Sequence, residues 1–311
     1  MKFIWIFLFL LMGMVSVQSQ DSTLQELKEQ GRIVLSREPD SARLPVHAEF
    51  RTGLDSLLRA TKDSLLPLDS LSNLSVLYAP DSSLRVITWM FPYDNGAYQF
   101  FGFLHYKSGN NNWNLVELKD KHKSIKEPQK KRLSPGKWYG ALYYDIIVHD
   151  SLITLLGWNG YHRQKKEKII ETLWFDEDSE PVFGKKVFPE YRSNYEENVS
   201  RVIFQYANEA TMALRYAEVL HEVEEPRENR MIGGVKRVKK RQNLIVFNKL
   251  EPIQPMFEGD FKYYVPLSEK LLGFSYDKGQ WILLEDVKIL SEQAPVVDEA
   301  RPELNLFPQD K

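Results

Sequence analysis

The chain has 311 residues, of which 43% are hydrophobic and 13% aromatic, and its formal net charge is −2. This length allows one large domain or two small ones, and the hydrophobic content is enough for a packed core. The balanced charge gives no overall basic field, so we expect no nucleic-acid partner. Cysteine is absent, which excludes disulfides, thiol nucleophiles, thiolate metal sites and a lipid attached to cysteine.

The N-terminus has the three parts of a secretory signal peptide. Lys2 supplies the positive start, an apolar run covers residues 3–15, and Val17 and Ser19 are the small residues of a cleavage site. The run is shorter than the roughly 20 residues of a membrane-spanning helix. We therefore expect a signal peptide over residues 1–19, export across the inner membrane, and a periplasmic or secreted protein without a stable membrane span. An uncleaved membrane anchor is the alternative.

Residues 20–72 are predicted to form an N-terminal helical segment. Leu24 and Leu27 begin a short helix that Gly31 is expected to stop. A longer helix follows and ends at Pro67, and its apolar stripe is expected to pack on the sheet that comes next. The stripe consists of Phe50, Leu54, Leu57, Leu58 and Leu65.

Residues 73–290 are predicted to form an antiparallel β domain. The sequences Asp94-Asn95-Gly96 and Asp277-Lys278-Gly279 are strong hairpin turns, because their residues tolerate positive φ. Between residues 138 and 188 lie four apolar β-rich runs joined by turns, which predicts a meander of strands buried on both faces. A further hairpin is expected from the runs over 201–207 and 211–217, on either side of Asn208-Glu209-Ala210.

Two polar segments interrupt this domain. Residues 119–137 form a basic connection with few apolar residues, which we interpret as a solvated linker; a patch for polyanions or lipid headgroups is the alternative. Residues 218–241 are acidic and then basic, which indicates an exposed, self-complementary loop or the tip of a long hairpin. The tail over 291–311 is expected to be flexible.

These elements predict a mainly β fold of antiparallel meander sheets, sandwich- or barrel-like, with the N-terminal helices packed against them. Turn signals recur along the chain, so a β-propeller-like fold is the alternative. No fixed repeat length accompanies the turns.

Familiar catalytic and metal-binding motifs are missing from the sequence. The pair His221-Glu222 begins a zinc-protease pattern, but Glu225 stands where the second histidine is required. Asp176, Asp178 and Glu180 have a spacing that suits calcium ligands, yet the full loop pattern is absent and a solvated turn is favoured. We therefore predict no catalytic residue, no metal and no cofactor.

The sequence Gly157-Trp158-Asn159-Gly160 is the most unusual local motif. Its glycines permit a tight twisted turn over which Trp158 could pack as part of the core. Alternatively, a tryptophan beside polar turn residues could stack on a sugar or peptide. Trp158 and Asn159 are therefore the candidate ligand-binding residues.

Several runs of the sequence stand out together: Lys137-Trp-Tyr-Gly-Ala-Leu-Tyr-Tyr, Thr154-Leu-Leu-Gly-Trp-Asn-Gly, Pro181-Val-Phe-Gly and Arg201-Val-Ile-Phe-Gln-Tyr. With these runs the chain resembles a family of exported proteins of unknown function from Bacteroidota-type bacteria. The resemblance implies a bacterial, exported protein and carries no activity or site residues with it.

Two functions remain open at this point. The first is an exported or periplasmic, non-catalytic binding or envelope-associated protein with an unknown partner. The second is a carboxylate-dependent hydrolase of envelope or extracellular polysaccharide. Two carboxylates facing each other at roughly 5–9.5 Å in a deep groove would favour the hydrolase.

Overall fold

The computed structural model describes residues 22–61, 68–108, 112–161, 163–189, 198–226, 235–285 and 287. The predicted signal peptide and the tail over 291–311 lie outside these residues. The chain is mainly β, with 50% of the described residues in strands and 22% in helices. It forms two compact units, and the boundary falls between Glu117 and Leu118. The helices and the first sheet thus belong to one unit.

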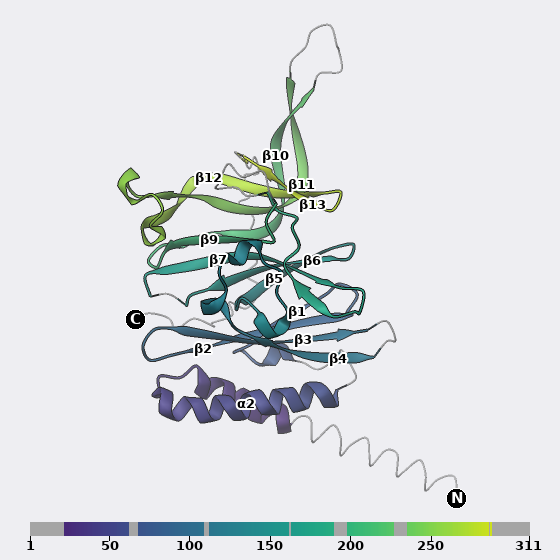
Figure 1. Ribbon diagram of the computed structural model, residues 1–311, viewed down its shortest axis with the longest axis vertical. Coiled ribbons are helices and arrows are strands. Elements are labelled where there is room, and N and C mark those ends of the chain that lie inside the picture. Colours follow the sequence, from purple (N-terminus) through teal and green to yellow (C-terminus); the bar gives the residue numbers. More distant parts are fainter. Residues whose placement is uncertain are drawn as a thin grey trace, which may run out of the picture. The chain divides into compact units, whose positions relative to one another are not determined.

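The first unit packs helices on one face of a four-stranded antiparallel sheet (Figure 1). Its helical elements are residues 22–34, α2 (Asp40–Ala60) and the 3₁₀ turn η1 (Leu68–Ser70). The sheet order is β1 (Ser75–Tyr78), β2 (Leu84–Pro92), β3 (Tyr98–Lys107) and β4 (Trp113–Lys119). The predicted stripe residues Phe50, Leu54, Leu57 and Leu58 are buried against Ile87, Trp89 and Phe103; Leu65 lies outside the described residues.

The helix boundaries differ from the prediction. Gly31 does not stop the first helix, which continues to residue 34. A Cβ at Gly31 would overlap the side chain of Asn73, so glycine is needed there for close packing. Helix α2 begins well before its apolar stripe and contains Pro45 in its second turn, where proline removes one backbone donor from the helix.

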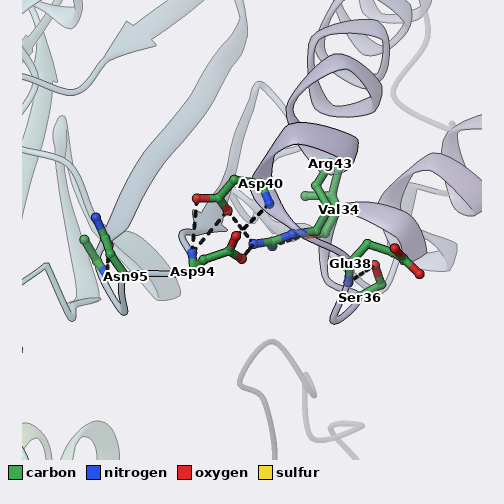
Figure 2. A network of polar contacts seen from close by, with 8 residues as sticks. Val34, Ser36, Glu38, Asp40, Arg43, Asp94 and Asn95 are labelled. Carbon is green, nitrogen blue, oxygen red and sulfur yellow. Dashed lines mark hydrogen bonds and ion pairs between the residues drawn. The ribbon is translucent and has the colours of Figure 1, made fainter.

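A buried arginine ties the start of α2 to the β2–β3 hairpin turn (Figure 2). Arg43 donates to Asp40 Oδ1 at 2.7 Å, to Asp94 Oδ1 at 2.9 Å and to the carbonyl of Val34 at 3.0 Å. The backbone N–H groups of Asp40 and Asp94 each donate to the other residue's carboxylate. The predicted hairpin turn is present, and of its Asn95-Gly96 pair only Gly96 has positive φ, at 78°.

The second unit contains two antiparallel sheets that pack face to face. The first has the order β5 (Leu142–His149), β6 (Leu152–Asn159), β7 (Lys165–Phe175) and β8 (Pro181–Phe183), and β9 (Arg201–Ala207) also pairs with β7. The predicted central meander over residues 138–188 corresponds to β5–β8 and is confirmed.

The second sheet of this unit has the order β10 (Leu214–Pro226), β11 (Val235–Pro252), β12 (Tyr264–Asp277) and β13 (Gln280–Leu284). The 3₁₀ turns η5 (Pro255–Phe257) and η6 (Phe261–Tyr263) join β11 to β12. Large apolar side chains from both sheets fill the layer between them, including Leu156, Phe204, Phe247, Phe274 and Trp281. The three sheets within the described residues are open, so the fold is sandwich-like in this unit.

The predicted hairpin between the runs over 201–207 and 211–217 is wrong. Strand β9 pairs with β7 in the first sheet, whereas β10 pairs with β11 in the second. The chain therefore crosses between sheets at residues 208–213. A turn sequence such as Asn208-Glu209-Ala210 fixes the bend, while packing decides which strand each run joins.

Strands β10 and β11 extend beyond their sheet as a two-stranded ribbon (Figure 1). Strand β12 pairs with β11 from Ile245 onward, so the earlier residues of β11 pair with β10 alone. Opposite charges face each other across the ribbon, as in the pair Glu222 and Lys239. The predicted long hairpin is thus present. The zinc-protease reading of His221 is excluded because His221 lies on a strand.

Candidate functional site

The two faces of the β5–β9 sheet are set by the alternation of β7. Lys168 lies opposite Trp158 on one side and Phe204 on the other, and Phe204 belongs to the core between the sheets. Its neighbour Glu167 lies opposite Asn159 and Gln205. Since side chains alternate along a strand, Glu167, Asn159 and Gln205 share the outer face of the sheet.

The two candidate residues Trp158 and Asn159 therefore lie on opposite faces. The expected Gly157-Trp158-Asn159-Gly160 turn is wrong, because the first three residues lie within β6. Trp158 is 6% exposed and its ring packs against Gly160, where a Cβ would overlap it. The amide of Asn159 donates to the carbonyl of Gly140 at 2.8 Å and accepts from the N–H of Tyr161 at 2.9 Å.

A polar pocket of about 330 Å³ lies on the outer face. It contains Asn159 but not Trp158 among its described lining residues. Its size is within the range of roughly 300–1,000 Å³ typical of small-molecule sites. The described lining residues are His122, Lys123, Tyr139, Asn159, Tyr161, Lys165, Glu167 and Gln205.

The cover of this pocket is the connection between β4 and β5. It contains the short 3₁₀ helices η2 (His122–Ser124), η3 (Pro128–Lys130) and η4 (Pro135–Lys137). Its two ends are joined by the N–H of Lys121, which donates to the carbonyl of Trp138 at 2.8 Å. The cationic side chains are largely exposed, as expected, but the backbone is held by hydrogen bonds rather than being a free linker.

Within the connection, Asp120 fixes the ring of His122. Asp120 Oδ1 lies 2.6 Å from His122 Nδ1 and also accepts the backbone N–H of His122 at 3.1 Å. Their side chains are 3% and 10% exposed. Gly140 has φ 75°, and a Cβ at this position would overlap the Asp120 carboxylate, so glycine allows the carboxylate to sit here.

The opposite nitrogen of the ring, His122 Nε2, is buried and has no hydrogen-bond partner among the described residues. The ring of Tyr161 lies edge-on to the imidazole, with centroids 4.1 Å apart. A carboxylate on Nδ1 sets the ring orientation, which leaves Nε2 as the polar atom that can bond to a ligand. Nε2 accepts in a neutral imidazole and donates in an imidazolium.

The floor of the pocket carries one carboxylate, that of Glu167, among the described lining residues. Its Oε2 accepts from the hydroxyl of Tyr139 at 3.0 Å, and its Oε1 accepts from the amide of Gln205 at 2.6 Å. Burial, followed by the negative charge of Glu167, raises the pKa of Tyr139 well above its usual range. Tyr139 is therefore a neutral phenol that donates a hydrogen bond to Glu167.

Two lysines make the pocket positive. Lys123 Nζ lies 4.4 Å from the centre of the Tyr161 ring, and Lys165 Nζ lies 6.0 Å from that of Phe261. Neither ammonium group pairs with a carboxylate among the described residues. With Glu167 as the single described carboxylate of the lining, these cations favour a ligand that carries a negative charge.

A second, mostly apolar pocket of about 360 Å³ lies beside the first. The two pockets share Tyr139 and Gln205. The described residues that line the apolar pocket are Ile125, Pro128, Gln129, Tyr139, Pro189, Val199, Arg201, Val202, Ile203, Gln205 and Phe261.

A buried ion pair fixes the connection against the sheet at the apolar pocket. Arg201 Nε lies 2.7 Å from Glu171 Oε2, and both side chains are fully buried. Burial raises the pKa of Glu171, and the positive charge of Arg201 opposes that rise. Arg201 also donates to the carbonyls of Pro128 and Lys131, the latter at 3.0 Å, and so holds η3 in place.

The acidic segment that was weighed as a calcium site has a structural role, and so does the histidine at the end of β5. Asp176 Oδ1 accepts the N–H groups of Asp178 and Glu180, which makes the acidic segment a self-bonded turn. Within the described ranges, no cluster of three or more histidine, aspartate or glutamate side chains is placed to hold a metal ion. His149 stacks on Tyr276, with ring centroids 4.2 Å apart; His162 lies outside the described residues.

Sequence reasoning missed most of the polar pocket. Asp120 and His122 belong to the segment interpreted as a linker, and Glu167 and Gln205 carried no motif. The one available signal was a carboxylate two residues before a histidine, a spacing that is common in ordinary turns.

Comparisons with family models, with curated proteins and with solved structures give no match for this chain. Among the helices that the structure describes, none combines the length and apolar character needed to cross a membrane.

Proposed function

We propose that this chain is an exported, non-catalytic binding protein whose polar pocket holds a small acidic sugar. Export rests on Lys2, the apolar run at 3–15 and the small residues before position 20. The observation that carries the binding proposal is His122. His122 lines the pocket, its ring is fixed by Asp120, and its Nε2 is buried without a hydrogen-bond partner among the described residues. A buried polar atom without a partner is costly, and a ligand group that bonds to it removes that cost.

The rest of the lining suits a sugar acid. The ring of Tyr161 offers an apolar face, and the carboxylate of Glu167 has oxygen lone pairs for sugar hydroxyl groups. Lys123 and Lys165 supply positive charge for the acid group, and Lys165 lies next to Glu167 on the same face of β7.

The polysaccharide hydrolase finds less support at this site. Paired-carboxylate hydrolysis needs one acid and one base or nucleophile that reach the same bond. Both oxygens of Glu167 already accept hydrogen bonds, and Asp120 is directed to the ring of His122. These contacts favour supporting roles for the two carboxylates, and they are the reason for proposing binding.

Calorimetry with glucuronic acid and with glucose tests the proposal. We expect the intact mature protein to bind glucuronic acid more tightly than glucose, because only the acid reaches the lysines with a charge. His122→Ala should weaken the binding of glucuronic acid about tenfold, which corresponds to ~1.4 kcal/mol of binding free energy. Lys126→Ala is the matched control, since Lys126 is an exposed lysine of the same connection outside the described lining. Equal affinity for the two sugars, or an unchanged affinity in His122→Ala, would contradict the proposal.

A further inference from the structure

The two adjoining pockets differ in chemistry, one mostly polar and the other mostly apolar, and from this we infer that the ligand is an amphiphile. Its acidic sugar head occupies the polar pocket, and a single hydrocarbon chain continues from the head into the apolar pocket. This inference rests on the proposed function, because it extends the ligand of the same site.

Continuity between the pockets is provided by shared walls. Tyr139 and Gln205 line both pockets, and both donate to Glu167 at the floor of the polar one. A second link is formed by Lys165 and Phe261. Lys165 lines the polar pocket, Phe261 lines the apolar one, and the ammonium lies 6.0 Å from the centre of the ring. A ligand that extends out of the polar pocket in this direction therefore contacts apolar side chains directly.

The apolar pocket is suited to hydrocarbon rather than to a second polar group. Ile203 on β9 and Phe261 on η6 are half-buried and present apolar surface to it. The one charged side chain of its described lining, Arg201, pairs with Glu171 through Nε and donates to two carbonyls through Nη1, while its buried Nη2 has no hydrogen-bond partner among the described residues. Its volume of about 360 Å³ is enough for a short chain. Each methylene that enters should tighten binding by about fourfold at most.

Calorimetry with four probes on the intact mature protein separates the head from the chain. Glucuronic acid has the head alone, octyl glucuronide has both parts, octyl glucoside has the chain with a neutral head, and glucose has neither. All are used below their critical micelle concentrations. We expect octyl glucuronide to bind at least tenfold more tightly than glucuronic acid and more tightly than octyl glucoside.

Two isoleucine variants localise the chain. Ile203→Thr keeps a β-branched residue on the strand and makes the wall of the apolar pocket more polar. It should weaken the binding of octyl glucuronide several-fold and leave the affinity for glucuronic acid unchanged. The matched control is Ile282→Thr on β13, a position that is 46% exposed and outside the described lining of both pockets. This variant should leave both affinities unchanged.

The outcomes distinguish this inference from the proposed function. If glucuronic acid binds and octyl glucuronide binds no more tightly, the inference is overturned and the sugar-acid site stands. If octyl glucoside binds as tightly as octyl glucuronide, the acidic head is wrong and the proposed function is overturned. Binding of none of the four probes overturns both. An equal loss of octyl glucuronide affinity in Ile203→Thr and Ile282→Thr would also contradict the placement of the hydrocarbon chain in the apolar pocket.

Discussion

At the scale of single residues, Trp158 and Asn159 show how a strand separates neighbouring side chains. Both were candidates for one ligand site because they adjoin in the sequence. In the structure, Asn159 lines the polar pocket while Trp158 shares the inner face with Lys168. The indole is therefore a buried side chain of the inner face, and its loss should affect stability rather than binding.

Replacement of Trp158 by alanine tests this assignment. Trp158 is 6% exposed, so we expect Trp158→Ala to lower the free energy of unfolding by ~3–5 kcal/mol, as is usual for a large buried aromatic residue. Urea denaturation provides the measurement. Met256→Ala is the control at a side chain that is 78% exposed, where the change should stay below ~0.5 kcal/mol. An unchanged midpoint for Trp158→Ala would show that the indole is not a core residue.

His47 is a second residue whose environment has a measurable consequence. It lies on α2 among Trp89, Phe91 and Phe101, and its Nε2 accepts the indole N–H of Trp89 at 3.0 Å. Burial, followed by the positive charge of Arg51, lowers the pKa of His47 to about 4. The histidine is thus neutral in the folded protein across the physiological pH range.

The lowered pKa predicts acid sensitivity of the first unit. The unfolded state, with a histidine pKa of about 6.5, binds more protons than the folded state between pH 6.5 and 4. The contribution of neutral His47 to the free energy of unfolding is therefore complete above pH 6.5, and it is lost as the pH falls towards 4. Between pH 7 and 5 the natural protein should lose about 2 kcal/mol more unfolding free energy than His47→Gln. The pKa of His105 is also lowered to about 4, but His105 titrates in both proteins and cancels. The free energy of unfolding is measured by urea denaturation at each pH. The same dependence on pH in the natural protein and in His47→Gln would rule the effect out.

At the scale of elements, the Arg43 network decides how α2 meets the β2–β3 turn. Arg43 is buried and is the shared donor for Asp40, Asp94 and the carbonyl of Val34. Removing the guanidinium leaves two carboxylates close together and a carbonyl without this donor. The network therefore differs from an ion pair on an exposed helix face.

We expect Arg43→Met to lower the free energy of unfolding by about 2–3 kcal/mol, because each hydrogen bond it removes involves a charged group. The matched control is Arg59→Met on the same helix, where Arg59 pairs with Asp55 one turn away at an exposed site. That change should cost less than ~0.5 kcal/mol. Thermal melts of the two variants side by side make the comparison. Similar losses of stability in the two variants would mean that the buried Arg43 network stabilises the fold no more than an exposed ion pair does.

Local turn chemistry explains which elements were predictable. The hairpins at Asn95-Gly96 and Lys278-Gly279 were found because those turns demand positive φ, and the structure has φ 78° at Gly96 and 85° at Gly279. The crossing between β9 and β10 was missed because a turn sequence at residues 208–210 fits either a hairpin or a change of sheet. Strand partners depend on contacts with distant residues, which no local sequence shows.

The polar pocket was hidden for a related reason. Strand β7 begins with charged residues on both faces, so its alternation between inner and outer positions is not visible in the sequence. Lys168 buries its stem on the inner face, with its Nζ 4.3 Å from the centre of the Tyr144 ring. Glu167 is buried on the outer face because Tyr139 and Gln205 donate to it. Such burial depends on partners brought together by the fold.

At the scale of the whole molecule, the two-stranded ribbon is the part expected to open first. Ribbon residues before Ile245 have no third strand beside them, and two-stranded hairpins are only marginally stable by themselves. The connection over 119–132, the other basic segment, is held by backbone hydrogen bonds such as that from Ser200 to the carbonyl of Gln129. The two segments should therefore differ in their sensitivity to proteases.

Limited trypsin digestion with mass spectrometry tests this difference. The earliest cuts should fall between Lys236 and Arg241, where most side chains are exposed. Cuts over 119–132 should appear later, because they need the connection to leave the sheet. Early cleavage within the connection, or inside β5–β8, would show that the order of opening is wrong.

The separation of the two faces of β7 has a consequence for how this protein can change over evolutionary time. Point mutations at outward positions can change the lining of the polar pocket while the inward neighbours keep the sandwich intact. A deletion of one codon in the middle of the same strand would invert the later residues, moving core side chains outward and pocket side chains inward. Lineages carrying this fold should therefore diversify by substitution within the strand and accept insertions and deletions only in the segments around it.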